Sequence, residues 1–98
     1  MWKKMEQQQR SDILNLVKAV LGYRTNVRDE LLFRIIDSVV DELEEVKGIP
    51  FDFGNNEIVM YVVDMAVFRY QNLGGGTIPR NLEYRLKNLI VKYRLGGV

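Results

Sequence analysis

The stretch EIVMYVVDMAVFRYQN (57–72) decides the fold class of this chain, because its β-branched first half alone would also suit a strand. Its length argues for a helix, since sixteen residues exceed a usual strand and no turn residue interrupts them. One face at helical spacing contains Glu57, Met60 or Tyr61, Asp64, Phe68 and Gln71. The pattern predicts a central, mostly buried helix.

The residues before this stretch also show helical periodicity. A short helix is predicted from a Ser11 N-cap to Gly22. A longer helix is predicted from a cap at Thr25 or Asn26 to Gly48. The inward face of the short helix is predicted to hold Ile13, Leu14, Val17 and Leu21. The inward face of the longer helix is predicted to hold Leu31, Leu32, Ile35, Ile36, Val39, Val40, Leu43 and Val46. The face opposite is predicted to hold Glu30, Arg34, Asp37, Asp41 and Glu44 or Glu45.

The two remaining connections have their own signals. In the loop GIPFDFGNN (48–56), Phe51 and Phe53 are predicted to fill the core, and Asn55 or Asn56 to cap the next helix. After three glycines, Pro79 suits the first turn of a last helix. The inward face of that helix is predicted to hold Leu82, Leu86, Leu89, Ile90 and Tyr93.

Together these segments predict an all-α fold, a small bundle of about four helices in a single domain over residues 1–98. The polar opening MWKKMEQQQR (1–10) lacks helical apolar spacing and is predicted to be a flexible arm. Its Trp2 packs either on the body of the protein or on a neighbouring molecule. A glycine-rich loop is predicted before the last helix.

Composition excludes much familiar enzyme chemistry. The chain has no histidine and no cysteine, so it lacks the commonest general base, the commonest metal ligand and any thiolate or disulfide. Its apolar runs are far shorter than the ~20 residues that cross a bilayer, and no signal peptide opens the chain. We predict a protein that stays inside the cell and has no catalytic residue, no cofactor, no metal and no membrane partner.

Charge is distributed unevenly although the net charge is only +1. Residues 37–57 carry seven acids and one base, Lys47. Residues 80–98 carry five bases and one acid, Glu83. Such an acidic sector and basic end can steer the association of copies, attract DNA, or simply face solvent.

The three glycines at 74–76 raise the question of a phosphate-binding loop. No strand is predicted before them, and neither a Gly-Lys-Ser/Thr motif nor a dinucleotide fingerprint is present. Because glycine keeps backbone freedom that is costly to order, the loop is predicted to be mobile, either as a hinge or interface loop or as a plain surface linker.

Two charged features remain to be explained. Asp64 lies in the most apolar helix, where it faces solvent at the helix edge, caps a loop, or forms an ion pair between subunits. Arg69 is five residues away and therefore on a different face from Asp64.

The last helix carries a second stripe at helical spacing, formed by Arg80, Tyr84, Lys87, Val91 and Arg94. A DNA backbone can lie along such a stripe, although the glycine loop does not fit the short turn of a helix-turn-helix reader.

Three quoted segments carry a resemblance to a known family. The chain resembles the small head-tail connector proteins of tailed bacteriophages and prophages over roughly residues 13–92. The segments that resemble them are VVDMAVFRYQN, IPRNLEYRLKNLI and VLGYRTNVRDELLFRIIDSVVDELEEVKGI. The residues that carry the resemblance are Asp64, Arg69, Tyr70, Asn72, Pro79, Arg80, Leu82, Arg85 and Leu86.

The resemblance implies a structural virion protein without enzymatic activity, the portal adaptor or head-completion protein of a phage. Such a subunit is made in the bacterial host cytoplasm and forms a ring of about a dozen copies below the portal protein. The ring joins the head to a tail-side stopper or completion protein, and genomic DNA passes through its channel. In similar proteins one chain end embraces the portal, and the basic C-terminal region is the expected end here, although RLGGV is a short ending for the family.

A ring needs two unlike surfaces on each subunit, and the two charged sectors can supply them. We expect Asp37, Asp41 and Glu45 of one copy to dock near Arg80, Arg85 or Lys87 of the next. The predicted subunit or portal interface consists of Asp37, Asp41, Glu45, Asp64, Arg69, Gly74, Gly75, Gly76, Arg80, Arg85, Lys87 and Arg94. The alternative is a small helical DNA-binding module that places Arg80, Lys87 and Arg94 on phosphates.

Overall fold

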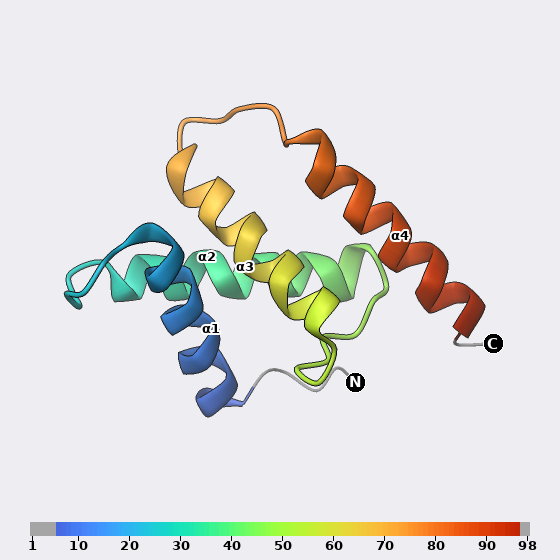
Figure 1. Ribbon diagram of the computed structural model, residues 1–98, viewed down its shortest axis with the longest axis horizontal. Helices are drawn as coiled ribbons and strands as arrows, with labels where there is room; N and C mark the ends of the chain where they lie inside the picture. The colour runs from blue at the N-terminus through green and yellow to red at the C-terminus, as the bar shows by residue number, and fades with distance from the viewer. Residues whose placement is uncertain (1–5, 97–98) are drawn as a thin grey trace.

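The computed structural model describes residues 6–96, and it confirms an all-helical fold (Figure 1). No strand occurs among these described residues. The elements are α1 (Gln7–Leu21), α2 (Asp29–Asp41), the π-helical turn η1 (Glu42–Val46), α3 (Asn56–Gln71) and α4 (Arg80–Gly96).

Helix α1 begins earlier than its sequence pattern predicts. It starts at Gln7 rather than after Ser11, so the prediction of a flexible arm is wrong for residues 6–10, while residues 1–5 and Trp2 lie outside the described part. The extra turn is helical because α2 holds it: the Arg10 guanidinium pairs with Asp37 and lies 4.6 Å from the centre of the Phe33 ring. These partners are distant in sequence, so the polar run of glutamines gave no local sign of them.

Helix α2 begins at Asp29, three or four residues after the predicted caps Thr25 and Asn26, and it continues through η1 to Val46. The wider π turn brings Glu44 inward, where its side chain is buried and accepts a 2.9 Å hydrogen bond from the Phe51 backbone N–H. Glu45 is exposed, so it and not Glu44 continues the outer face. Leu31 and Val46, predicted to point inward, are exposed at the margins of the stripe.

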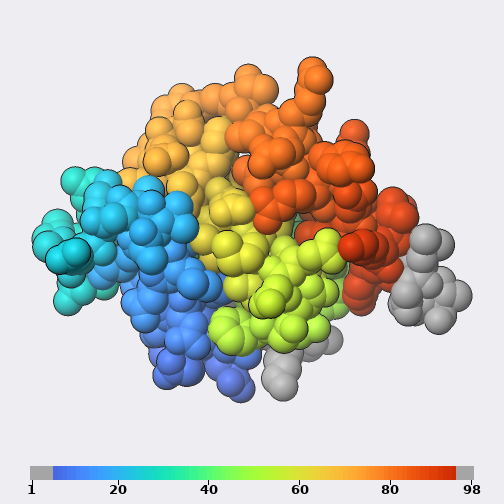
Figure 2. Space-filling model, in the orientation of Figure 1, coloured from blue at the N-terminus to red at the C-terminus, as the bar shows by residue number. Residues whose placement is uncertain are grey.

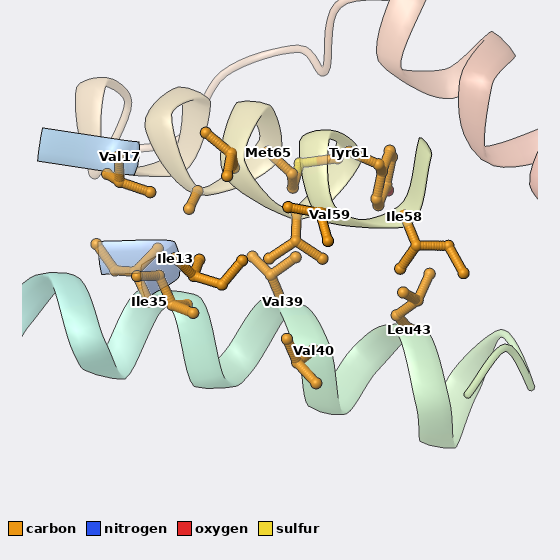
Figure 3. Packing of buried hydrophobic residues seen from close by; sticks show 14 of the residues in the cluster. Ile13, Val17, Ile35, Val39, Val40, Leu43, Ile58, Val59, Tyr61 and Met65 are labelled. Carbon is orange, nitrogen blue, oxygen red and sulfur yellow. The ribbon is translucent and has the colours of Figure 1, made fainter. Parts of the chain in front are cut away.

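Helix α3 is the centre of the core, as predicted. Asn55 caps it, since its side-chain oxygen accepts from the Glu57 backbone N–H at 3.0 Å. The sequence left open whether Met60 or Tyr61 shares a face with Glu57. Met60 is exposed, as Glu57 is, whereas Tyr61 is buried. Figure 3 shows core side chains of α2 and α3 meeting between the two helices. The core side chains that are fully shielded from solvent include Ile13, Val17, Ile36, Val62, Val63 and Ala66.

The arrangement of helices places α3 between α1 and α4 (Figures 1 and 2). Helices α1 and α2 pack on each other and on α3, whereas α4 packs on α3 alone among the described elements. Leu82 and Leu89 are buried in this contact, but Tyr93, predicted to point inward, is 44% exposed. Phe51 and Phe53 are partly buried against the core, as predicted. Helix α4 is therefore the element least tied to the rest of the molecule.

Candidate interaction surfaces

The outer face of α4 is the first candidate surface. All five residues of the second stripe predicted from the sequence are exposed, with Tyr84 at 66% and Val91 at 54%. This outer stripe consists of Arg80, Tyr84, Lys87, Val91 and Arg94. It combines three cations with two apolar side chains on one rigid helix, and aromatic and Arg side chains are enriched where proteins meet one another.

The outer face of α2 is the second candidate surface, and the structure reduces the number of its acids that are available to a partner. Asp37 is already paired within the chain, because both its oxygens accept from the Arg10 guanidinium at 3.0 and 2.8 Å. Asp41 and Glu45 lie further along the same face and are exposed. We call Asp41 and Glu45 the acidic face. They are the acids of the predicted interface that remain available to a partner.

Asp64 and Arg85 form an ion pair that joins α3 to α4, with 2.7 Å between Oδ2 and Nη1. The pair lies within one chain, and the Asp64 side chain is still 38% exposed, so it lies at the edge of α3 as one of the sequence-based interpretations holds. Arg85 is likewise engaged by an acid inside the subunit. Both side chains are about one third exposed, so solvent screening limits the pair to roughly 1 kcal/mol or less.

Arg69 also contacts an acid inside the chain. Its guanidinium pairs with Glu42 of η1, and this pair ties the second half of α3 to the end of α2. A second exposed pair, Lys92 with Glu57 at 2.9 Å, joins α4 to the first turn of α3. Sequence spacing did not predict either partner, because the partners are 27 and 35 residues apart.

The glycine loop has a defined course. Gly75 and Gly76 have φ values of 108° and 154°, a region that L side chains rarely adopt, and the Gly75 N–H donates to the Asn72 carbonyl at 2.9 Å. A Cβ on Gly76 would also lie 3.2 Å from the Asn72 side-chain oxygen. Gly74 meets neither constraint. These conformational needs account for two of the three glycines without a phosphate.

A cleft of about 330 Å³ lies between α4 and the end of α2. Its floor is apolar, and charged side chains border it. The lining residues are Val39, Glu42, Leu43, Lys47, Tyr61, Met65, Arg69, Ile78, Glu83, Leu86, Lys87 and Ile90. Burial raises the pKa of Tyr61 above its usual value, with a further rise from the charge of Glu42. Helix α4 packs on α3, and the cleft lies on the side of α4 that faces the end of α2.

A third cluster was missed by sequence reasoning. Tyr23, Arg28 and Tyr70 meet where the loop after α1 reaches the end of α3, with the two tyrosine rings edge to face at 5.9 Å. The Arg28 guanidinium donates to the Tyr70 hydroxyl and lies over the Tyr23 ring. The sequence offered only one sign of this cluster, two tyrosines and an arginine placed in turns and at a helix end. These residues have no characteristic spacing from which their contact could be predicted.

Two further properties of the described residues concern clusters of metal-binding side chains and helices that could span a membrane. Among residues 6–96, no group of three or more Asp and Glu side chains is arranged to hold a metal ion. None of the described helices has the length and apolarity required to cross a bilayer.

Comparison of the chain with family models, with curated proteins and with solved structures finds no match.

Proposed function

We propose that this protein is a structural assembly subunit of the head-tail connector type, as its sequence resemblance implies, and not an enzyme. Its partners would be copies of itself in a ring of about a dozen, the portal protein on one side and a tail-side completion protein on the other. Its place would be the virion head-tail junction, with genomic DNA only passing through the channel.

The observation that carries the proposal is the pair of unlike exposed surfaces. The outer stripe of α4 is basic and partly apolar, whereas the acidic face of α2 carries Asp41 and Glu45. A closed ring is built from one patch meeting a different patch on the next copy. Opposite charges on those patches favour the correct register and speed up association.

The internal ion pairs change which residues belong in this contact. Asp37 and Arg85 already have partners inside the subunit, at 2.8 and 2.7 Å. The proposed contact therefore joins the acidic face to Lys87, with Arg80 and Arg94 on either side of it along the outer stripe.

Charge reversal at this contact tests the proposal. Asp41→Arg and Lys87→Glu should each reduce annular particles when the protein is mixed with the portal of the same phage, and the double variant should restore them. Negative-stain microscopy and sedimentation would count the rings. The matched control is reversal of the exposed intrahelical pair, Glu30→Arg with Arg34→Glu, which should leave ring formation unchanged. Damage that simply adds in the Asp41/Lys87 double variant would reject the contact, and wild-type protein that forms no rings with the portal would reject the function.

The exposed outer stripe also supports a second candidate function, a DNA-binding module. Arg80, Lys87 and Arg94 are all exposed along one face of α4 and can contact successive phosphates. This alternative predicts duplex affinity that falls steeply as salt rises, by roughly 0.9 in the logarithmic slope for each phosphate contacted. Fluorescence anisotropy with wild-type protein and Lys87→Glu measures this slope. Absence of binding at low salt would exclude the module.

A further inference from the structure

Helix α4 is held by one element only. Among the described elements it packs on α3 and contacts neither α1 nor α2. The apolar part of that contact is small, since Leu82 and Leu89 are buried while Leu86 and Ile90 are only partly buried. The interactions that dock α4 on α3 are thus repeated on the α3 surface of any other copy.

The ion pairs of this contact each join an acid on α3 to a base on α4. On α3, Glu57 and Asp64 present carboxylates, and on α4, Lys92 and Arg85 lie 2.9 and 2.7 Å from them. Two pairs that lie at separate points along both helices define the register of α4 on α3. They would define the same register if the two helices came from different copies.

The connection to α4 is long enough to permit this. Residues 72–79 link the helices, and all of 71–78 are exposed. Eight residues span at most about 26–29 Å when extended, a distance comparable with a small domain. Gly75 and Gly76 lie in this connection with positive φ, and glycine keeps the backbone freedom that a change of direction there requires.

The cleft beside α4 is a further observation in favour of a movable α4. A space of about 330 Å³ lies between α4 and the end of α2, so packing on that side is incomplete and opposes its departure less than a filled contact would. The exchange would not create or destroy contacts, and only the hinge conformation and the entropy of association differ between the two arrangements. In an assembly that holds copies side by side, the high effective concentration offsets that entropy.

We infer that α4 is an exchangeable arm, which docks on α3 of a second copy of this chain in place of its own. The occupant of the α3 surface in the exchanged form is α4 of the partner copy, with its Arg85 on the first copy's Asp64 and its Lys92 on the first copy's Glu57. This inference goes beyond the ring proposal, and it uses none of the residues that test the ring contact.

Mixing two charge-reversed chains tests the exchange. In Glu57→Lys the pair with Lys92 becomes repulsive within the chain, and the same is true of Lys92→Glu. When the two variants are refolded together from urea, exchange places opposite charges against each other in both halves of a mixed dimer. We expect the dimer fraction, measured by light scattering and native mass spectrometry, to be about fivefold larger in the mixture than in either variant alone.

A second pair strengthens the measurement, and a double variant controls it. Asp64→Arg mixed with Arg85→Asp should behave in the same way, and circular dichroism would first establish that each variant folds. The double variant Glu57→Lys/Lys92→Glu, mixed with wild type, should form no mixed dimer, because exchange would then bring like charges together. Two folded single variants whose mixture stays monomeric would overturn the inference, as would mixed dimers in the double-variant control. Failure of the exchange leaves the Asp41/Lys87 contact intact, so the two proposals fail separately.

Discussion

At the scale of single residues, Glu44 has the most consequential position. Its carboxylate is buried within η1 and accepts a 2.9 Å hydrogen bond from the Phe51 backbone N–H, at the loop that leads to α3. An ionised acceptor makes a stronger hydrogen bond than a neutral one, and a buried N–H without a partner is costly. One side chain therefore joins the π turn to the following loop.

Replacing Glu44 tests this role. Glu44→Ala should lower the free energy of unfolding in urea by roughly 1–3 kcal/mol, because the Phe51 N–H loses its acceptor. Glu44→Gln should cost less, since its amide oxygen can still accept. The matched control is Glu45→Ala on the exposed side of the same turn, expected within about 0.5 kcal/mol of wild type. Equal losses at positions 44 and 45 would contradict the assignment.

The tyrosine cluster gives a prediction about proton binding. The hydrogen bond from Tyr23 lowers the pKa of Tyr70, and the hydrogen bond from Arg28 lowers it further, because both stabilise the Tyr70 phenolate. The same hydrogen bond to Tyr70 raises the pKa of Tyr23. As pH rises, Tyr70 should therefore lose its proton before Tyr23.

Nuclear magnetic resonance of labelled tyrosines would follow these two titrations separately. Tyr23→Phe should raise the pKa of Tyr70 toward its usual value, since the phenolate loses a donor. Tyr84→Phe is the control, because that ring is exposed on α4 and outside the cluster. A Tyr70 titration unchanged by Tyr23→Phe, or Tyr23 titrating first, would show that the cluster does not form in solution.

At the scale of elements, the caps and the packing of each helix account for where it lies. Helix α3 begins at a capped residue and then buries most of its circumference, whereas α2 buries one stripe and α4 a narrower one. Asn55→Ala should destabilise the protein by about 1 kcal/mol, because the N–H of Glu57 and that of Ile58 lose their acceptor.

The neighbouring Asn56 provides the control for this cap. It is exposed at the first position of α3, so Asn56→Ala should have a much smaller effect on thermal and urea unfolding. If both substitutions destabilised the protein equally, the cap would have been assigned to the wrong residue.

At the scale of the whole molecule, stability should be distributed unevenly. Helices α1, α2 and α3 share one core, while α4 adds to it from one side through a single neighbour. Segments with few buried contacts open with lower free energies than the core. Native-state amide exchange should therefore show α4 opening at lower denaturant than α3.

A substitution in the contact sharpens this expectation. Leu89→Ala removes a side chain that is 4% exposed between α4 and α3, and it should speed exchange in α4 much more than in α1 or α2. Val91→Ala on the exposed side of α4 is the matched control. Uniform acceleration over all four helices would mean that α4 unfolds only together with the core.

What the sequence by itself determined is the set of helices and the exposed stripe of α4. Hydrophobic period, caps and glycines act over a few residues, so 57–72 was predicted as a buried helix and the stripe from Arg80 to Arg94 as a surface. The ends of the helices were predicted less well where a distant residue decides them. The start of α1 is an example, because the partner of Arg10, Asp37, lies 27 residues away.

Only the tertiary structure decided which charged residues meet. Asp64 and Arg85 are 21 residues apart, and their pairing depends on how α4 crosses α3, which no local pattern encodes. The inward turn of Glu44 likewise depends on the N–H that the next loop presents to it. Helical period is a property of neighbouring residues, whereas ion pairing depends on the three-dimensional arrangement of whole helices, and for this reason the elements were predictable and their partners were not.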